Sequence, residues 1–173
     1  ALTIDRYEHP SRAGTLPTTG KGPAEASALC KARGQRLCTE TQWQEACSAG
    51  GRNPYLLPTR SFPKSGDGKW RLRDALIERC ALGSGALHSS GAMPDCVSGV
   101  GVTDIVGNAY EWVSLDEGVS TTRPGMWGLA GGYHGYRDLT LSSCDFTVLV
   151  HEAQVRDLDL AAVGFRCCGP ADR

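Results

Sequence analysis

GVTDIVGNAYEWV, residues 101–113, combines a tight turn, two carboxylates and a strand pattern in one short stretch. Gly107 and Asn108 accept a positive φ angle, so the backbone can double back at this pair. Residues 109–114 then alternate small, aromatic, charged and apolar side chains, as a half-buried strand does. The stretch therefore predicts a turn that leads directly into a strand.

This turn is also a candidate cation site. The turn can direct the backbone carbonyls of Gly107 and Ala109 inward, between the carboxylates of Asp104 and Glu111. Calcium takes roughly six to eight oxygen ligands, and these four residues supply part of such a shell. Spacing alone nevertheless favours the simpler interpretation, a Gly-Asn turn whose carboxylates face water.

The composition predicts one loop-rich domain over residues 1–173. The chain is 40% hydrophobic, enough to bury a core, and its 22 glycines and nine prolines indicate many loops. A net charge of −1 gives no electrostatic reason to expect nucleic acid or an anionic membrane as partner. No run approaches the roughly 18 apolar residues of a membrane span, so we expect a mature domain without membrane insertion.

Eight cysteines without a Cys-x-x-Cys pair argue against a zinc ribbon or a thioredoxin-type site. An even number in a loop-rich chain is typical of a disulfide framework formed in an oxidising compartment. Cys167 and Cys168 are adjacent, and neighbouring strand residues point to opposite faces, so these two need different partners. The remaining pairings stay open on the sequence alone.

Two helices have clear start and stop signals. Pro23 fits the first turn of a helix that runs to about Arg33, with Gly34 as its stop. Thr39 and Gln42 have capping-box spacing and open a second helix that ends at residues 49–51. The other predicted elements are strands, at residues 2–8, 69–73, 109–114, 126–132 and 163–168.

The segment Asp104–Trp112 resembles the signature of the formylglycine-generating enzyme family, also called the sulfatase-modifying factor domain. Three further segments agree in order: Arg36–Cys47, Ala130–Gly132 and Gly164–Cys168. The resemblance implies an α+β, C-type-lectin-like fold in which two helices pack on short antiparallel sheets, loop-rich and cross-linked by disulfides. It also favours the calcium interpretation of Asp104, Gly107, Ala109 and Glu111, with Ca²⁺ in a structural role.

The resemblance further implies a disulfide pattern. The long-range bridges of the family correspond to Cys30 with Cys167 and to Cys47 with Cys144. Cys80 and Cys96 would close a local loop, which leaves Cys38 with Cys168.

Family enzymes oxidise a substrate cysteine at a copper ion held by two cysteine thiolates, soft ligands suited to Cu(I). These cysteines lie four and nine residues after the glycine pair, where this chain has Tyr136 and Leu141. We therefore expect no copper and no catalytic residues. A copper-dependent oxidase of the family type that uses other cysteines is the alternative, and a structural module of a larger envelope protein is a third possibility.

The segment after Gly131 and Gly132 is rich in tyrosine, histidine, arginine, aspartate and threonine, the composition of recognition loops. Relatives with the same fold use this segment as a variable binding face, although its tyrosines can alternatively pack into the core. The predicted ligand-binding residues are Tyr133, His134, Tyr136, Arg137, Asp138 and Thr140. We expect a non-catalytic recognition or adhesion domain of a secreted, periplasmic or cell-surface protein, bacterial in origin, that binds a protein, peptide or glycan.

Overall fold

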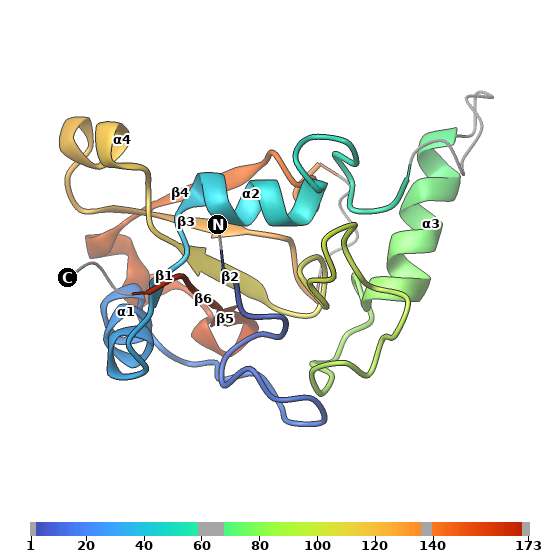
Figure 1. The fold of residues 1–173 in the computed structure, drawn as a ribbon, viewed down its shortest axis with the longest axis horizontal. Coiled ribbons are helices and arrows are strands. Elements are labelled where there is room, and N and C mark those ends of the chain that lie inside the picture. Colours follow the sequence, from blue (N-terminus) through green and yellow to red (C-terminus); the bar gives the residue numbers. More distant parts are fainter. Residues whose placement is uncertain (1–2, 59–67, 136–139, 171–173) are drawn as a thin grey trace.

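The computed structural model describes residues 3–58, 68–135 and 140–170 and has an α+β architecture (Figure 1). Its helices are α1 (Pro23–Ala32), α2 (Glu40–Ser48), α3 (Gly68–Cys80) and α4 (Glu117–Thr122), with 3-10 turns η2 (Glu152–Asp157) and η3 (Leu160–Ala162). Its strands are β1 (Arg36–Leu37), β2 (Tyr110–Val113), β3 (Met126–Ala130), β4 (Thr147–His151), β5 (Val163–Phe165) and β6 (Cys167–Cys168). None of the helices in these ranges has the length and apolar character needed to cross a membrane.

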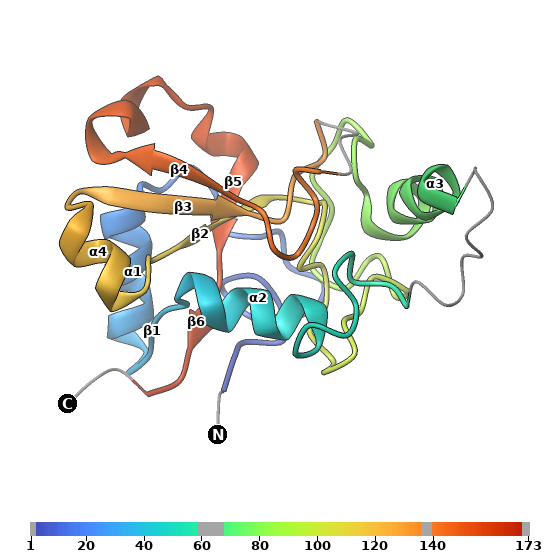
Figure 2. The same cartoon turned by 90° about the horizontal axis from the view of Figure 1, so that it is seen from above.

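The main sheet has four strands in the order β4-β3-β2-β5, with α2 in front of it in Figure 1 and to one side of it in Figure 2. β3 pairs antiparallel with both β2 and β4, but β5 runs parallel to β2, with Glu111 opposite Gly164. The sheet is therefore mixed rather than purely antiparallel. The parallel pair brings the end of the chain, including Arg166, beside the strand that carries Glu111.

The capping signals of α1 and α2 are confirmed. Pro23 occupies the first turn of α1, and Gly34 follows the helix with φ +70°. In α2 the Thr39 hydroxyl accepts a hydrogen bond from the Gln42 amide at 3.3 Å, and the Gln42 side chain accepts one from the Thr39 amide at 3.1 Å. These reciprocal bonds satisfy amides at the helix start that have no partner within the helix.

Two predictions of secondary structure were wrong, and one short helix was not predicted. Residues 69–73 form the start of α3, not a strand, and the buried side chains of Leu72, Ala75, Leu76 and Cys80 recur at helical spacing. Of the strand predicted at residues 2–8, the described part makes only an isolated bridge between Ile4 and Cys168. The short helix α4 follows Asp116, in a segment for which no helix or strand was predicted.

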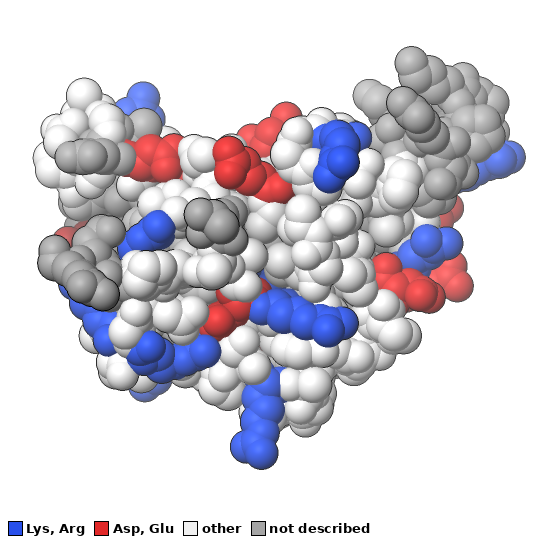
Figure 3. Space-filling view, in the orientation of Figure 1, with Lys and Arg blue, Asp and Glu red and all other residues white. Residues whose placement is uncertain are grey.

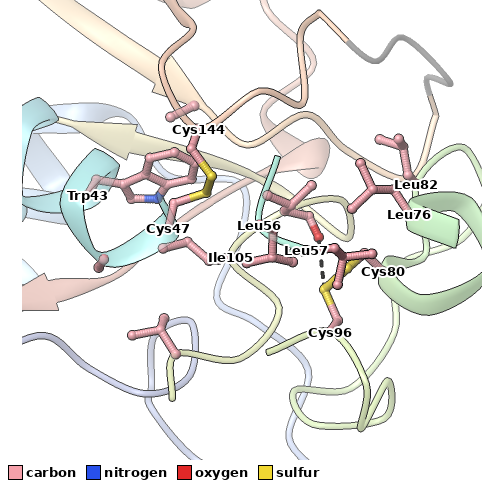
Figure 4. Close-up of a cluster of buried hydrophobic side chains, with 14 of the residues drawn as sticks. Trp43, Cys47, Leu56, Leu57, Leu76, Cys80, Leu82, Cys96, Ile105 and Cys144 are labelled. Atoms are coloured by element: carbon pink, nitrogen blue, oxygen red, sulfur yellow. Dashed lines mark hydrogen bonds between the residues drawn. A yellow bond between two sulfur atoms is a disulfide. The ribbon is translucent and has the colours of Figure 1, made fainter. Parts of the chain in front are cut away.

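Two apolar clusters form the core. One surrounds Trp43 of α2 and includes α3 and Ile105 (Figure 4), and the other surrounds Trp112 of β2. Four disulfides cross-link the chain: Cys30–Cys167, Cys38–Cys168, Cys47–Cys144 and Cys80–Cys96. Three of them tie N-terminal elements to the C-terminal part of the chain, and Cys167 and Cys168 have different partners.

Gly107 and Gly131 are required by close approach of the backbone. A Cβ atom on Gly107 would lie 1.9 Å from the Cys80 carbonyl oxygen, and one on Gly131 would lie 2.6 Å from the Ile105 carbonyl oxygen. Both residues have positive φ angles, and the Gly107 amide donates to the Gly131 carbonyl at 2.8 Å. The two glycine signals of the sequence therefore meet in one tightly packed place.

Candidate functional site

The residues around the turn form a buried charged cluster. The Glu111 carboxylate accepts hydrogen bonds from Arg166 Nη2 at 2.6 Å, Arg166 Nε at 2.8 Å and Trp43 Nε1 at 2.8 Å. The side chains of Glu111 and Arg166 are both fully buried. Both oxygens of the predicted calcium ligand Glu111 are thus bound by donors of the protein itself.

Asn108, the second residue of the turn, holds a further buried carboxylate, that of Glu8, which was not predicted from the sequence. Its side-chain amide donates to the two carboxylate oxygens of Glu8 at 3.0 and 3.3 Å, and the Ser90 hydroxyl donates to Glu8 at 3.1 Å. Burial, and then the charge of Glu111, raise the pKa of Glu8 to about 8. At neutral pH the neutral form of Glu8 therefore predominates.

Asp104 is the third carboxylate of this region and is also buried. It has φ +57°, and its side chain accepts the Gly91 amide at 2.6 Å. Burial raises the pKa of Asp104, and the Gly91 hydrogen bond opposes that rise. Asp104 and Glu111 are therefore near the same turn, as predicted, but each already has protein partners.

The arrangement does not fit a calcium ion between Asp104 and Glu111 without rearrangement. Ca²⁺ would have to take the place of the Arg166 guanidinium at Glu111, and within residues 3–58, 68–135 and 140–170 no three acidic, histidine or cysteine side chains are grouped to hold a metal. Calcium binding through Asp104, Gly107, Ala109 and Glu111 stays a prediction from the sequence.

Thermal unfolding tests that prediction. If the ion binds, millimolar Ca²⁺ should raise the melting temperature of the wild-type protein, because a ligand that binds only the folded state stabilises it. Asp104→Asn should reduce this rise without touching the Arg166 ion pair. Identical melting curves in Ca²⁺ and in chelator would show that the turn is held by the ion pair alone.

A second group of polar and aromatic residues follows Gly131 and Gly132. The rings of Tyr133 and Tyr110 are stacked with their centroids 4.9 Å apart, and His134 meets Tyr133 edge-on at 5.4 Å. The turn positions this segment, because the His134 amide donates to the Asn108 carbonyl at 2.9 Å. The fold therefore joins the central turn to the predicted binding segment through one backbone hydrogen bond.

The tyrosine pair lines a pocket of about 190 Å³. Besides Tyr110 and Tyr133, the lining residues are Leu129, Leu158, Asp159, Ala162 and Val163. We call this the tyrosine pocket. It is mainly apolar, with the exposed carboxylate of Asp159 as its acidic member.

His134 lies beside the pocket with its Nδ1 atom buried and without a hydrogen-bond partner among the described residues. Burial lowers the pKa of His134, and the charge of Asp159 acts in the opposite direction. The imidazole is therefore mostly neutral at neutral pH. Because Nδ1 is buried and His134 does not line the pocket, the imidazole supports the pocket through its edge-on contact with Tyr133.

The predicted binding residues divide into two groups. The structure brings Tyr133 and His134 to the tyrosine pocket and leaves Thr140 exposed, whereas Tyr136, Arg137 and Asp138 lie outside the described residues. Sequence reasoning missed Tyr110 and Asp159. Tyr110 follows the central turn closely in the sequence, so its place near the site could have been predicted. Asp159 comes from a loop distant in the sequence, and no local pattern indicated that it would line the pocket.

The fold and the two glycine signals define a disulfide-linked α+β domain with a small pocket beside its central turn. The sequence profile of the sulfatase-modifying factor enzyme 1-like domain matches residues 6–170, and the chain belongs to this family. The resemblance inferred from the sequence is thereby confirmed. A comparison with curated protein sequences gave no match.

Several solved structures share the fold at low sequence identity. CarF is 14% identical with a TM-score of 0.56, over 99% of this chain and 87% of CarF. PvdO from Pseudomonas aeruginosa is 14% identical with a TM-score of 0.52, over 98% of this chain and 80% of PvdO. Variable protein 1 of Treponema denticola is 16% identical with a TM-score of 0.54, over 79% of this chain. The aligned region spans only 48% of the Treponema protein.

Proposed function

We propose that this domain recognises a protein, peptide or glycan ligand and does not transform it. The observation that carries the proposal is the tyrosine pocket, which is lined by the stacked rings of Tyr110 and Tyr133 and by the carboxylate of Asp159. Tyrosine offers a large contact area at low entropic cost, and polar neighbours add adaptable hydrogen bonds.

The size of the pocket indicates what kind of ligand fits. Sites for free small molecules usually measure about 300 to 1,000 Å³, whereas the tyrosine pocket measures about 190 Å³. It has room for one side chain or one sugar ring. We infer an anchor for one residue of a larger ligand, whose other parts lie along the surrounding surface.

The disulfides weigh against the alternative of a copper oxidase. All eight cysteines are joined in four disulfides, so no thiolate is free to bind Cu(I). Tyr136 and Leu141 stand where family enzymes carry their copper ligands. A thiol titration of the native protein distinguishes the two functions, since an oxidase requires at least two free thiols.

The same disulfides support a place outside the reducing cytosol. Four structural bridges in a chain of 173 residues are typical of proteins made in an oxidising compartment. We propose that the domain is secreted, periplasmic or attached to a cell surface. Recognition of an external partner is consistent with each of these locations.

A binding screen followed by mutation tests the proposal. The folded domain is screened on glycan and cell-surface protein arrays, and the affinity of each hit is then measured for Asp159→Asn. Asparagine keeps the 3.2 Å hydrogen bond that residue 159 accepts from the Ala161 amide, so only the charge is lost. We expect Asp159→Asn and Tyr133→Ala each to weaken binding about tenfold or more, as at other aromatic and charged anchors.

Tyr55→Ala is the matched control. Tyr55 is half-buried against the Trp43 cluster and does not line the tyrosine pocket. Its loss should lower stability as Tyr133→Ala does, while ligand affinity stays unchanged. Equal loss of affinity in both tyrosine variants would assign the effect to stability, and unaltered affinity in Asp159→Asn and Tyr133→Ala would remove the tyrosine pocket as the binding site.

A further inference from the structure

A larger groove lies between the end of α2 and the N-terminal segment, and it shares no lining residue with the tyrosine pocket. Its volume is about 700 Å³, within the range of about 300 to 1,000 Å³ that ligand sites occupy. One wall consists of Glu45, Ala46, Ala49, Gly50 and Arg52, and the other of Thr3, Ile4, Arg6, Val100, Gly101 and Val102. We call it the α2 groove.

The groove has a mainly apolar surface with charges at its edges. Gly50 and Gly101 are exposed and have no side chain, so a peptide main chain can approach closely, and Val100 is 55% exposed. On the face of the molecule that carries α2, uncharged side chains fill the centre, and both basic and acidic groups lie above and below it (Figure 3). An exposed apolar surface with charged edges is typical of a binding surface.

Two arginines contribute from opposite walls. Arg52 is fixed by a 2.8 Å hydrogen bond from its Nε atom to the Ala49 carbonyl, and the Arg6 guanidinium lies 5.4 Å from the centre of the Tyr7 ring. Neither forms an ion pair with a carboxylate of the described residues. Both guanidinium groups can therefore bind an incoming anion, and arginine suits carboxylates because its planar donors match the two oxygens.

We propose that the α2 groove binds the C-terminal carboxylate of a peptide whose last residue is apolar. The terminal carboxylate lies between Arg6 and Arg52, and the last side chain contacts Ile4 and Val100. Glu45 is the third charged residue of the lining, so the groove carries one net positive charge, which matches a single carboxylate. The same Glu45 repels further acidic residues in the peptide.

The lining disfavours other ligand classes. None of its residues is aromatic, so it lacks the flat surface on which sugars and nucleic-acid bases stack. One net positive charge is also too little for a polyanion, whose binding depends on many phosphate contacts. A carboxylate joined to an apolar group satisfies both the arginines and the apolar surface.

Fluorescence anisotropy with a defined peptide panel tests the proposal. The probes are fluorescein-labelled hexapeptides that end in Val, Leu, Ile or Phe, each made with a free C-terminal carboxylate and as the C-terminal amide. We expect saturable binding of at least one free acid and about tenfold or weaker binding of its amide, because the amide removes the charge that the arginines recognise. No saturable binding across the panel up to about 1 mM would overturn the proposal.

Variants locate the site. Arg6→Gln with Arg52→Gln should weaken the free-acid peptide about tenfold or more, whereas Arg12→Gln with Arg123→Gln, an equal change in charge at exposed positions outside the groove, should not. Equal effects of the two pairs, equal affinity of acid and amide, or equal competition by inorganic phosphate would each overturn it. Asp159→Asn should bind the peptide as wild type does, because Asp159 lines the tyrosine pocket and not the α2 groove. The two binding proposals can therefore be tested independently.

Discussion

Arg166→Leu should abolish or nearly abolish folding. All the N–H groups of this buried guanidinium have acceptors: Glu111 receives two hydrogen bonds, and the carbonyls of Asp5, Arg6 and Thr103 receive one each at 3.1 Å. Leucine would leave these acceptors buried without donors. Removing one partner of a buried ion pair costs about 3 to 5 kcal/mol, a large part of the roughly 5 to 15 kcal/mol that stabilises a domain.

Arg33→Leu provides the matched control. Arg33 bonds to Asp5 at 2.8 Å, as short as the Arg166 contacts, but its side chain is 35% exposed. Such an ion pair contributes about 0 to 1 kcal/mol, because water screens it. Denaturant unfolding followed by tryptophan fluorescence should separate the two variants clearly, and similar losses would show that burial of Arg166 does not determine its contribution.

The second large effect concerns pH and Glu8. In the unfolded chain its pKa has the ordinary value of 4.5, whereas burial, reinforced by Glu111, raises the folded pKa to about 8. The folded state therefore holds a proton more tightly than the unfolded state does. The contribution of this group is fully present below pH 4.5 and is lost as the pH rises through about 8, with a slope of up to about 1.4 kcal/mol per pH unit.

Glu8→Gln should flatten this dependence. Glutamine keeps an acceptor for Asn108 and Ser90 but has no proton to lose. Near pH 5 the variant and wild type should have similar unfolding free energies, and by pH 8 the variant should be the more stable by several kcal/mol, with about 4 to 5 kcal/mol as the upper limit. Urea unfolding at intervals between pH 5 and 8 measures the difference.

Glu25→Gln is the control for this series. Glu25 is exposed and pairs with Lys21 at 3.6 Å on the surface, so its replacement should change stability little at any of these pH values. Parallel pH profiles for wild type and Glu8→Gln would mean that Glu8 is ionised in the folded protein at neutral pH. The neighbouring Arg166 would then have to neutralise both Glu8 and Glu111.

Local sequence signals predicted some features of this fold correctly and missed others. Thr39 and Gln42 predicted the start of α2, and Gly107 with Asn108 predicted the tight central turn, because these signals act between residues close in the chain. The segment at residues 69–73 misled because its mixed side chains suit a strand as well as a helix in isolation. Leu72, Ala75, Leu76 and Cys80 carried the helical spacing that a longer window would have included.

The sequence by itself determined the family, both early helices, the central turn and the composition of the binding segment. The tertiary structure alone decided which groups face each other: Arg166 meets Glu111 across 55 residues, Asn108 meets Glu8 across 100, and Asp159 reaches the tyrosine pair from a distant loop. The reason is physical. A local pattern fixes backbone conformation through bonds between near neighbours, whereas the partner of a buried charge is set by the packing of the whole chain, which must satisfy every polar group that it removes from water.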